Sequence, residues 1–494
     1  MGVKRPDLPR IDFDWDAATW RAAAERFIDL ARDATVDVAS RPPAPTHPVR
    51  ADTFRTSDGN APRSIDELIE LLAAELLPSS AYNGHPRFMA YITSSPLPVG
   101  VLGDMLASAI NANVGLWRLA PAATAIELDT IDWIKKMVGY PDSAEGVFVS
   151  GGQFANILAH AVFREAKTPW DTRAHGMRGP DGNAPPVRVY AGQEVHYCHE
   201  QAAEFLGMGR ETVRLVPSDD AYRMRVDALA QMIAEDRARG DLPLAIAATA
   251  GTVGTGAVDP LRDLAAVAAT EDLWLHVDGA YGAFAAGVPS APEDLRALSL
   301  ADSIACDPHK WLYAPIDAGV TLVREPGLLQ AAFSFHPAYL ETEAVEGHAD
   351  MVERTPENSR RFRALKVWLA AQLYGHTGFR EMIERDIQLA AYMEQQVVET
   401  PPLVLAAPRS LSIVCWRVEP PGYGDAAALD RLQTAVIAEL EARGIAVVSN
   451  AKLRDGRTAI RACIVNFRTS ADDVEAVVHA SAEIGAELVV RAAV

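Results

Sequence analysis

Between residues 86 and 330, short runs rich in β-branched and apolar residues alternate with longer stretches of helical periodicity. This alternation constrains the fold strongly, because parallel strands need long crossover connections, which are usually helices. It predicts an α/β domain with a doubly wound, mainly parallel sheet of seven strands. We place these strands at Val147–Val149, Val187–Tyr190, Val213–Val216, Leu244–Thr249, Trp274–Val277, Ser303–Cys306 and Val320–Val323.

The segments on either side of this sheet have different patterns. Helical spacing over residues 16–33 and a capping box formed by Ser64 and Glu67 predict two amphipathic N-terminal helices, the second running to Leu77. Two such helices cannot bury both apolar faces alone, so we expect a partner subunit to cover them. After the sheet, residues 359–398 predict a helix, and strands are expected near 412–417, 445–448 and 459–466. The predicted division is a helical segment at 1–85, a large domain at 86–375 and a smaller C-terminal α+β domain at 376–494.

Charge and composition exclude several classes of partner. The formal net charge of −20 disfavours nucleic-acid binding, which needs a basic surface. No window approaches the roughly eighteen uninterrupted apolar residues of a membrane span. The four cysteines are scattered without a CxxC pair, and the N-terminus lacks the apolar core of a signal peptide. We therefore expect a soluble, cytoplasmic protein without nucleic-acid or membrane partners.

Reactive side chains follow five of the predicted strands. Ligands of open α/β sheets bind outside the carboxyl ends of the strands, so residues at those ends are expected to meet in one crevice. They are Ser150-Gly151-Gly152-Gln153 after the first strand, His196 after the second, Thr249 at the end of the fourth, Asp278 after the fifth, and Asp307-Pro308-His309-Lys310 after the sixth.

Each of these features has an ordinary structural explanation when it is taken alone. A Gly-Gly sequence between strand and helix is usually a tight turn, although its free amides suit a phosphate. His196 alone is more often a satisfied structural histidine, and Asp278 alone could be an N-cap, a metal ligand or a solvated loop acid. A lone lysine is usually on the surface, but Lys310 is flanked by His309 and Trp311 and follows a predicted buried strand. Burial can lower the pKa of such a lysine and make its amine nucleophilic.

In combination, the same residues match the four requirements of pyridoxal 5′-phosphate (PLP). This cofactor needs donors for its phosphate, a carboxylate that keeps the pyridine nitrogen protonated, a flat group against the ring, and a lysine for its aldehyde. Residues 150–153 with His309, then Asp278, His196 and Lys310, meet these requirements in turn, the lysine as a Schiff base. No metal ion is needed, and we predict none. The cofactor-binding residues that we predict are Gly152, Gln153, His196, Thr249, Asp278, Ala280, Asp307, His309 and Lys310.

On these residues the chain resembles the group II PLP-dependent decarboxylases, the family of aromatic-L-amino-acid and glutamate decarboxylases. The resemblance runs from about Glu67 to Ser470. Its most specific motifs are HVDGAYGA at 276–283 and ADSIACDPHKWL at 301–312. The others are HPRFMAYI at 85–92, WRLAPAATAIELD at 117–129, VFVSGGQFAN at 147–156, ATAGTVGTGAVDP at 248–260 and RRFRALKVW at 360–368.

The resemblance implies fold type I of the PLP enzymes and a homodimer in which the N-terminal segment wraps round its partner. It implies decarboxylation of an L-amino acid, with an aromatic side chain favoured, to the amine and CO₂. The catalytic residues are then expected to be Lys310, His196, Asp278 and Tyr339. The candidate substrate-binding residues are Phe88, Tyr91, Trp117 and Arg360. The first two are equally compatible with core packing, and Arg360 with anchoring of a helix terminus.

The chain departs from the family pattern at a few positions. Gln153 stands where a small serine is common, Ala120 replaces a common serine, and Val253 replaces a threonine. None of these changes removes one of the four PLP requirements. Gly115 stands where the animal aromatic-amino-acid enzymes carry phenylalanine, so we expect a pocket of different shape.

Residues 333–358 are polar, acidic and weakly periodic, which predicts a surface loop that acts as an active-site lid. A tyrosine in such a loop is usually a packing anchor, but the offset of Tyr339 from Lys310 resembles that of the family's lid tyrosine, which assists protonation at Cα. Related aldehyde synthases typically have phenylalanine there, so Tyr339 favours amine formation. Two alternatives stay open: oxidative decarboxylation and deamination to an aldehyde, and a non-catalytic scaffold, against which the complete set of cofactor residues counts.

Overall fold

The computed structural model describes residues 14–49, 52–55, 62–335, 345 and 348–492. The chain separates into two compact units, Met1–Tyr82 and Asn83–Val494. The predicted division at residues 85 and 375 stays a prediction.

The first unit contains the two N-terminal helices expected from the sequence. Helix α1 spans Ala17–Thr35, and helix α2 spans Ile65–Leu71 and continues as a π-helical turn over Leu72–Leu76. The capping box is present, because the Glu67 N–H donates to Ser64 Oγ at 3.2 Å and the Ser64 N–H donates to Glu67 Oε2 at 2.6 Å. Apolar side chains on and beside α1 stay exposed, namely Trp15, Trp20, Phe27 and Ile28.

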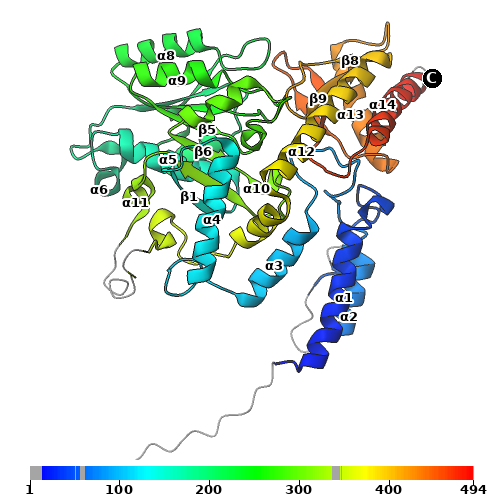
Figure 1. Ribbon diagram of the computed structural model, residues 1–494. Coiled ribbons are helices and arrows are strands. Elements are labelled where there is room, and N and C mark those ends of the chain that lie inside the picture. The colour runs from blue at the N-terminus through cyan, green and yellow to red at the C-terminus, as the bar shows by residue number, and fades with distance from the viewer. Residues whose placement is uncertain (1–13, 50–51, 56–61, 336–344, 346–347, 493–494) are drawn as a thin grey trace, which may run out of the picture. The chain divides into compact units, whose positions relative to one another are not determined.

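The second unit contains a seven-stranded sheet with the strand order β1-β7-β6-β5-β4-β2-β3. Figure 1 labels β1, β5 and β6 of this sheet. All pairings among β2, β3, β4, β5 and β6 are parallel, whereas β7 is antiparallel to both β1 and β6. The predicted mainly parallel, type I α/β fold is therefore confirmed. The strands are β1 Glu145–Val149, β2 Val187–Gly192, β3 Val213–Val216, β4 Leu242–Thr249, β5 Trp274–Asp278, β6 Ser303–Cys306 and β7 Gly319–Val323.

Helices cover this sheet, which explains why most of its strands read as continuous apolar runs rather than alternating ones. Every residue of β1, β5, β6 and β7 is buried. The helices before and between the strands are α3 Pro98–Ile110, α4 Pro121–Val138, α5 Gly152–Lys167, α6 Thr172–His175, α7 Cys198–Phe205, α8 Val226–Ala238, α9 Leu261–Thr270, α10 Pro308–Trp311 and α11 Leu328–Phe333.

A smaller antiparallel sheet follows, with the strand order β10-β11-β9-β8. Two of its strands were predicted, but the third prediction, at 445–448, is wrong. The strand β10 begins at Ser449 instead, because Val447 forms an isolated parallel bridge to Phe88. The elements of this part are β8 Leu403–Leu405, β9 Ile413–Val418, α13 Ala426–Ala442, β10 Ser449–Lys452, β11 Thr458–Cys463 and α14 Ala471–Ala492.

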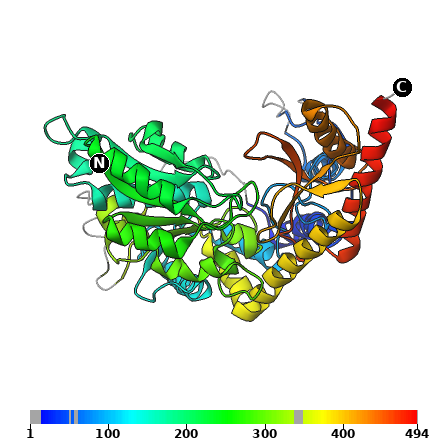
Figure 2. The same cartoon turned by 90° about the horizontal axis from the view of Figure 1, so that it is seen from above.

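Helix α12, Ala364–Glu399, connects the two sheets of the second unit (Figure 2). It packs on α3 and α4 near its start, and on β8 and α14 farther along. Gly375 interrupts it with a left-handed backbone, φ 61°, that favours glycine. Within the described residues, none of the helices is both long enough and apolar enough to cross a membrane.

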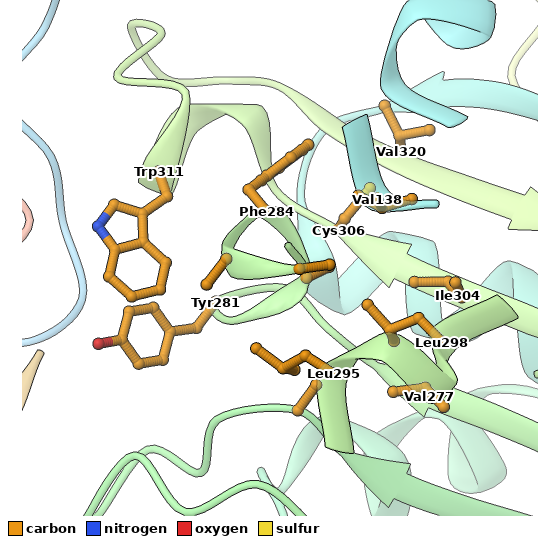
Figure 3. Packing of buried hydrophobic residues seen from close by; sticks show 14 of the residues in the cluster. Val138, Val277, Tyr281, Phe284, Leu295, Leu298, Ile304, Cys306, Trp311 and Val320 are labelled. Carbon is orange, nitrogen blue, oxygen red and sulfur yellow. The ribbon is translucent and has the colours of Figure 1, made fainter. Parts of the chain in front are cut away.

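The short helix α10 is fixed by a buried aromatic pair. The rings of Tyr281 and Trp311 stack with their centroids 4.5 Å apart (Figure 3). The Trp311 indole N–H and the Tyr313 hydroxyl both donate to Asp386 Oδ2, at 3.1 and 2.7 Å. These contacts hold the segment that contains Lys310 against α12.

Candidate active site

A cavity opens at the carboxyl ends of the parallel strands, where sequence reasoning places the site. Eight of the nine predicted cofactor residues line it, and His309 does not. The lining residues are Ile92, Gly152, Gln153, Asn156, His196, Cys198, Thr249, Gly251, Val253, Asp278, Ala280, Tyr281, Asp307 and Lys310.

Asp278, the last residue of β5, is a buried carboxylate surrounded by donors. Its Oδ1 accepts from the Ala280 N–H at 3.1 Å, and its Oδ2 accepts from the Asn156 amide at 3.0 Å. His199 Nε2 lies 3.4 Å from the same Oδ2. Burial alone would raise the pKa of Asp278, but His199 and Lys310 outweigh it and hold the pKa well below its usual range. The cavity therefore contains a fixed negative charge.

Lys310 projects into the cavity from α10, and its Nζ lies 3.1 Å from Asp307 Oδ2. The expectation that burial lowers the pKa of this lysine is wrong for the protein without cofactor. Burial does act in that direction, but the charges of Asp307 and Asp278 outweigh it and raise the pKa. The amine is thus held as an ammonium between two carboxylates.

His196 has an ordered, neutral ring at the cavity wall. Its Nδ1 accepts from the Cys198 N–H at 3.2 Å, which leaves Nε2 to carry the proton. Burial lowers the pKa of His196, so the ring is uncharged near neutral pH. A flat neutral ring at this place suits contact with an aromatic cofactor.

The start of α5 is shaped to admit an anion. A Cβ on Gly152 would lie 2.7 Å from Asp307 Oδ2 and 2.9 Å from Ala280 Cβ, so only glycine fits there. The first amides of this sixteen-residue helix are available to a phosphate. Gln153 donates its side-chain amide to Gln201 at 2.8 Å and is thereby turned toward that residue.

His309 lies behind this helix start rather than in the cavity wall. Its Nδ1 accepts from the Ala318 N–H at 3.2 Å, and its Nε2 lies 3.5 Å from Asp307 Oδ2. The ring is 3.1 Å from the position that a Cβ on Gly151 would take. It is therefore beside the helix start, on the side predicted for the phosphate.

Together these residues fit PLP. The cavity has anion-binding amides at one end, a buried carboxylate and a neutral imidazole along its wall, and a primary amine that reaches into it. Asp307 Oδ1 is also buried without a hydrogen-bond partner. The donor and acceptor set matches a phosphate, a protonated pyridine ring and an aldehyde.

Comparisons with known proteins agree with this geometry. The conserved domain of pyridoxal-dependent decarboxylases matches residues 50–419. The chain belongs to this family. An aromatic-L-amino-acid decarboxylase of Bacillus atrophaeus is 34% identical over 467 residues, which cover 93% of this chain and 94% of that protein. A phenylacetaldehyde synthase of Petunia hybrida is 29% identical over 361 residues, covering 72% and 71%. The crystal structure of Oryza sativa TDC with PLP and tryptamine has a TM-score of 0.89 and 25% identity, and the match covers 97% of this chain and 100% of that one.

Membership of the pyridoxal-dependent decarboxylase family makes the chain a PLP-dependent carboxy-lyase that acts on an amino acid. The non-catalytic scaffold is thereby disfavoured. The alternative of aldehyde formation is still represented among the relatives.

The four candidate substrate residues of this decarboxylase do not line the cavity. Phe88 is buried beside Val447, and Arg360 is fully buried and paired with Glu127. Trp117 stacks on His348 with ring centroids 4.1 Å apart. Tyr91 is 67% exposed, with φ 55°.

Two expectations concern the loop that follows α11. Tyr339 lies outside the described residues. The segment after it is attached to residues 113–117, since Asp350 accepts from the Trp117 N–H at 2.7 Å and the Val352 N–H donates to the Gly115 carbonyl at 3.1 Å. A Cβ on Gly115 would lie 2.8 Å from Val352 Cγ1, so this chain has no room for a phenylalanine at that position.

Sequence reasoning missed several lining residues, chiefly Asn156, Cys198 and Tyr281. Asn156 lies four residues after Gly152 on α5, so helical spacing would have placed it one turn behind the phosphate end. Cys198 lies two residues after His196. For Tyr281, only its place in the HVDGAYGA motif could have indicated that it lines the cavity.

Cys198, His199 and Asp278 offer three potential metal-ligand atoms within 4.8 Å of one another. The Asn156 amide, however, donates to both Cys198 Sγ and Asp278 Oδ2, at 3.2 and 3.0 Å. Two N–H bonds directed at these atoms oppose a cation. The prediction that the site uses no metal stays a prediction.

Proposed function

We propose that this decarboxylase converts an aromatic L-amino acid to its amine, with Lys310, Asp278, His196, His309 and Tyr339 as the working residues. The observation that carries the proposal is the convergence of the Lys310 amine and the buried Asp278 carboxylate in one cavity. Bound PLP supplies an electron sink for the pair left at Cα when CO₂ leaves.

The chain's own groups have separate tasks in this proposal. Asp278 would keep the pyridine nitrogen protonated, since it is an ionised carboxylate buried in the cavity wall. The first amides of α5, with Gly152 and Gln153, bind the phosphate, and His309 supports them from behind. His196 would offer its flat, neutral ring to the pyridine ring, and Thr249 and Ala280 would complete the cavity wall.

Lys310 is proposed to bind the aldehyde. Asp307 and Asp278 raise the pKa of its amine, so Lys310 would have to give up a proton before it could bind the aldehyde. Lys310→Ala should lose the covalent link to PLP that borohydride reduction fixes.

Lys310→Arg is the matched control for this test, because it keeps the charge beside Asp307 but cannot form the link. Both variants should retain the fold and lose the reducible cofactor. If a reduced sample instead carries the pyridoxyl group on Lys366 or another lysine, the assignment of Lys310 fails.

The aromatic substrate is supported by the named relatives and by apolar lining. The relatives include tryptophan and tyrosine decarboxylases as well as the Bacillus protein. Ile92 and Val253 contribute apolar surface to the cavity. Incubation with PLP and single amino acids, followed by analysis of CO₂ and amines, tests the proposal. Turnover of glutamate but not of tryptophan, tyrosine or phenylalanine would contradict it.

Aldehyde formation is the second candidate, because phenylacetaldehyde synthases are among the relatives. Tyr339 favours the amine, since its phenol could protonate Cα under a closed lid. Tyr339→Phe should still bind PLP and release CO₂, but should divert product toward aldehyde, ammonia and hydrogen peroxide. Oxygen uptake in proportion to CO₂ by the unaltered protein would establish the aldehyde reaction and refute the role of Tyr339.

We further propose that the chain works as a homodimer. Exposed apolar residues support this on each unit separately: Trp20 and Phe27 on α1, and a row along α3 of Leu102, Met105, Leu106 and Ile110, each about half exposed. Such surface is unusual for a monomer. Sedimentation should give twice the chain mass, and a stable, active monomer would contradict the proposal.

A cytoplasmic location is proposed from the cysteines. Cys198, Cys306, Cys415 and Cys463 are all buried and unpaired, as is usual where thiols stay reduced. Cell fractionation tests this, and recovery of activity outside the cytoplasmic fraction would contradict it.

A further inference from the structure

A chain of buried hydrogen bonds runs behind Asp278. The Trp274 indole nitrogen lies 2.8 Å from Ser303 Oγ, which lies 2.9 Å from His276 Nδ1. His276 Nε2 lies 2.7 Å from Asn156 Oδ1, and Asn156 Nδ2 donates to Asp278 Oδ2 at 3.0 Å. All five side chains are buried. Four successive hydrogen bonds thus connect Trp274 with the carboxylate.

The two ends of this chain determine its direction. An indole can only donate and an ionised carboxylate can only accept. The Asn156 amide must therefore direct its N–H toward Asp278 and its oxygen toward His276. His276 then carries its proton on Nε2, and its Nδ1 accepts from the Ser303 hydroxyl, which itself accepts from the indole. The opposite direction would place the Asn156 oxygen against the carboxylate.

His276 is neutral in this arrangement. Burial lowers its pKa to about 3, so the doubly protonated ring is absent near neutral pH. One tautomer therefore satisfies every donor and acceptor in the chain. Reversal of any one bond would leave a buried polar atom unpaired or two acceptors in contact, which is costly in a low-dielectric interior.

We propose that His276, together with Ser303 and Trp274, positions Asp278 for the pyridine nitrogen of PLP through this one-way chain of hydrogen bonds. The inference rests on the proposed role of Asp278. These three residues do not line the cavity, whereas Asn156 and Asp278 do. They act on the cofactor only through those two side chains, and are positioning residues rather than catalytic ones.

Other titratable groups also face Asp278 and contribute to any pH dependence. His199 Nε2 lies 3.4 Å and Cys198 Sγ 3.9 Å from Asp278 Oδ2, and Lys310 adds its charge from α10. His160 lies behind His199, with His160 Nε2 3.0 Å from His199 Nδ1. A suitable variant therefore changes a residue of the hydrogen-bond chain that does not touch His199, Cys198, Lys310 or His160.

Trp274→Phe meets that requirement, because it removes one indole N–H and keeps an aromatic ring. Without the donor, Ser303 is free to reverse and the N–H of Asn156 is held less firmly on Asp278. We expect the dissociation constant of PLP to rise about three- to tenfold, the loss that one hydrogen bond gives. The visible absorbance of the PLP-loaded protein reports the proton on the Schiff-base nitrogen. The pH at which this absorbance changes should shift upward, because a less positive pyridine ring withdraws fewer electrons and raises the pKa of that nitrogen.

Two further variants provide a second disruption of the hydrogen-bond chain and a control. Ser303→Ala breaks the chain at the hydroxyl and should shift both readouts in the same direction. Trp170→Phe is the matched control, since it removes an indole N–H bond to the Gly176 carbonyl, 2.9 Å long, that has no connection with Asp278. It should move neither readout.

The outcomes separate this inference from the proposed role of Asp278. Trp274→Phe and Ser303→Ala could lower the denaturation midpoint but leave PLP affinity and the absorbance profile unchanged. In that case the hydrogen-bond chain only stabilises the fold, and the inference is wrong. ¹⁵N spectra of histidine-labelled, PLP-free protein report the tautomer directly, and an Nδ1-protonated His276 would also overturn it. Unchanged PLP binding in Asp278→Asn would instead refute the role of Asp278 itself.

Discussion

The buried ion pair of Arg360 and Glu127 decides between two interpretations of Arg360 that the sequence leaves open. The guanidinium donates to Glu127 Oε1 at 2.6 Å and Oε2 at 3.2 Å, and to the carbonyls of Val114 and Phe148 at 2.5 and 3.0 Å. Both side chains have no exposed surface. Arg360 therefore ties the segment before α12 to α4 and β1, and it contributes nothing to the cavity wall.

Removal of one partner from such a pair costs about 3–5 kcal/mol, because the other charge stays buried without compensation. We expect Arg360→Ala to lower the free energy of unfolding by that amount. Arg360→Lys keeps the charge but loses the planar, bidentate contact, so its loss should be smaller, about 1–3 kcal/mol. The double variant Arg360→Met with Glu127→Leu should recover much of the loss, since no unpaired charge is left.

Denaturant titration of the PLP-free protein at one fixed protein concentration measures these differences, with the slope checked for each variant. Steady-state kinetics of the PLP-loaded variants give a second readout. If Arg360→Ala keeps the stability of the unaltered protein within about 1 kcal/mol while KM for the amino acid rises tenfold or more, Arg360 binds substrate. The structural interpretation would then be refuted.

Three further predictions follow from single contacts. Burial raises the pKa of Asp386 to about 7, so the folded protein keeps this proton where the unfolded chain has lost it. The free energy of unfolding should therefore fall between about pH 4 and pH 7, and Asp386→Asn should flatten that fall in denaturant titrations. Gly152→Ala would place a methyl group 2.7 Å from Asp307 Oδ2 and should abolish PLP binding in an absorbance titration. Gly115→Phe would collide with Val352 and should reduce the yield of folded protein, whereas an unchanged yield and Tm would contradict that reasoning.

The large sheet could be predicted because its strands are buried on both faces. A run such as residues 147–149 is apolar throughout and is bounded by turn residues, so the strand is visible in the sequence alone. The smaller sheet was harder. Ile445–Val448 is equally apolar, but its backbone forms only one isolated bridge, from Val447 to the distant Phe88, and the ladder begins one residue later, in the polar sequence SNAK. The apolar pattern of residues 445–448 indicates burial, but it does not indicate which residues pair with a neighbouring strand.

The candidate site was predictable to the extent that strand ends determine it. Parallel strands bring Asp278, Thr249 and Asp307 to one edge whatever the intervening loops do. The environment of each group was not predictable. The raised pKa of Lys310 depends on two carboxylates, one at the end of β5 and one just after β6, and the burial of Arg360 depends on Glu127, 233 residues away in the chain. Such long-range pairs leave no trace in the local pattern.

The single antiparallel strand of the large sheet is part of the site. Strand β7 runs antiparallel to β6, so it begins at the end of the sheet where β6 stops and Lys310 follows. Its first residue, Gly319, lies opposite Val149, the last residue of β1. A Cβ on Gly319 would lie 2.5 Å from Gly151 Cα, so the start of β7 packs directly against the turn that opens α5. Ala318, just before it, donates its N–H to His309 Nδ1. A parallel β7 would have to begin at the opposite end of the sheet, at the amino ends of the parallel strands, and could supply neither contact. The antiparallel strand therefore brings the proposed phosphate end and the proposed Schiff-base lysine together.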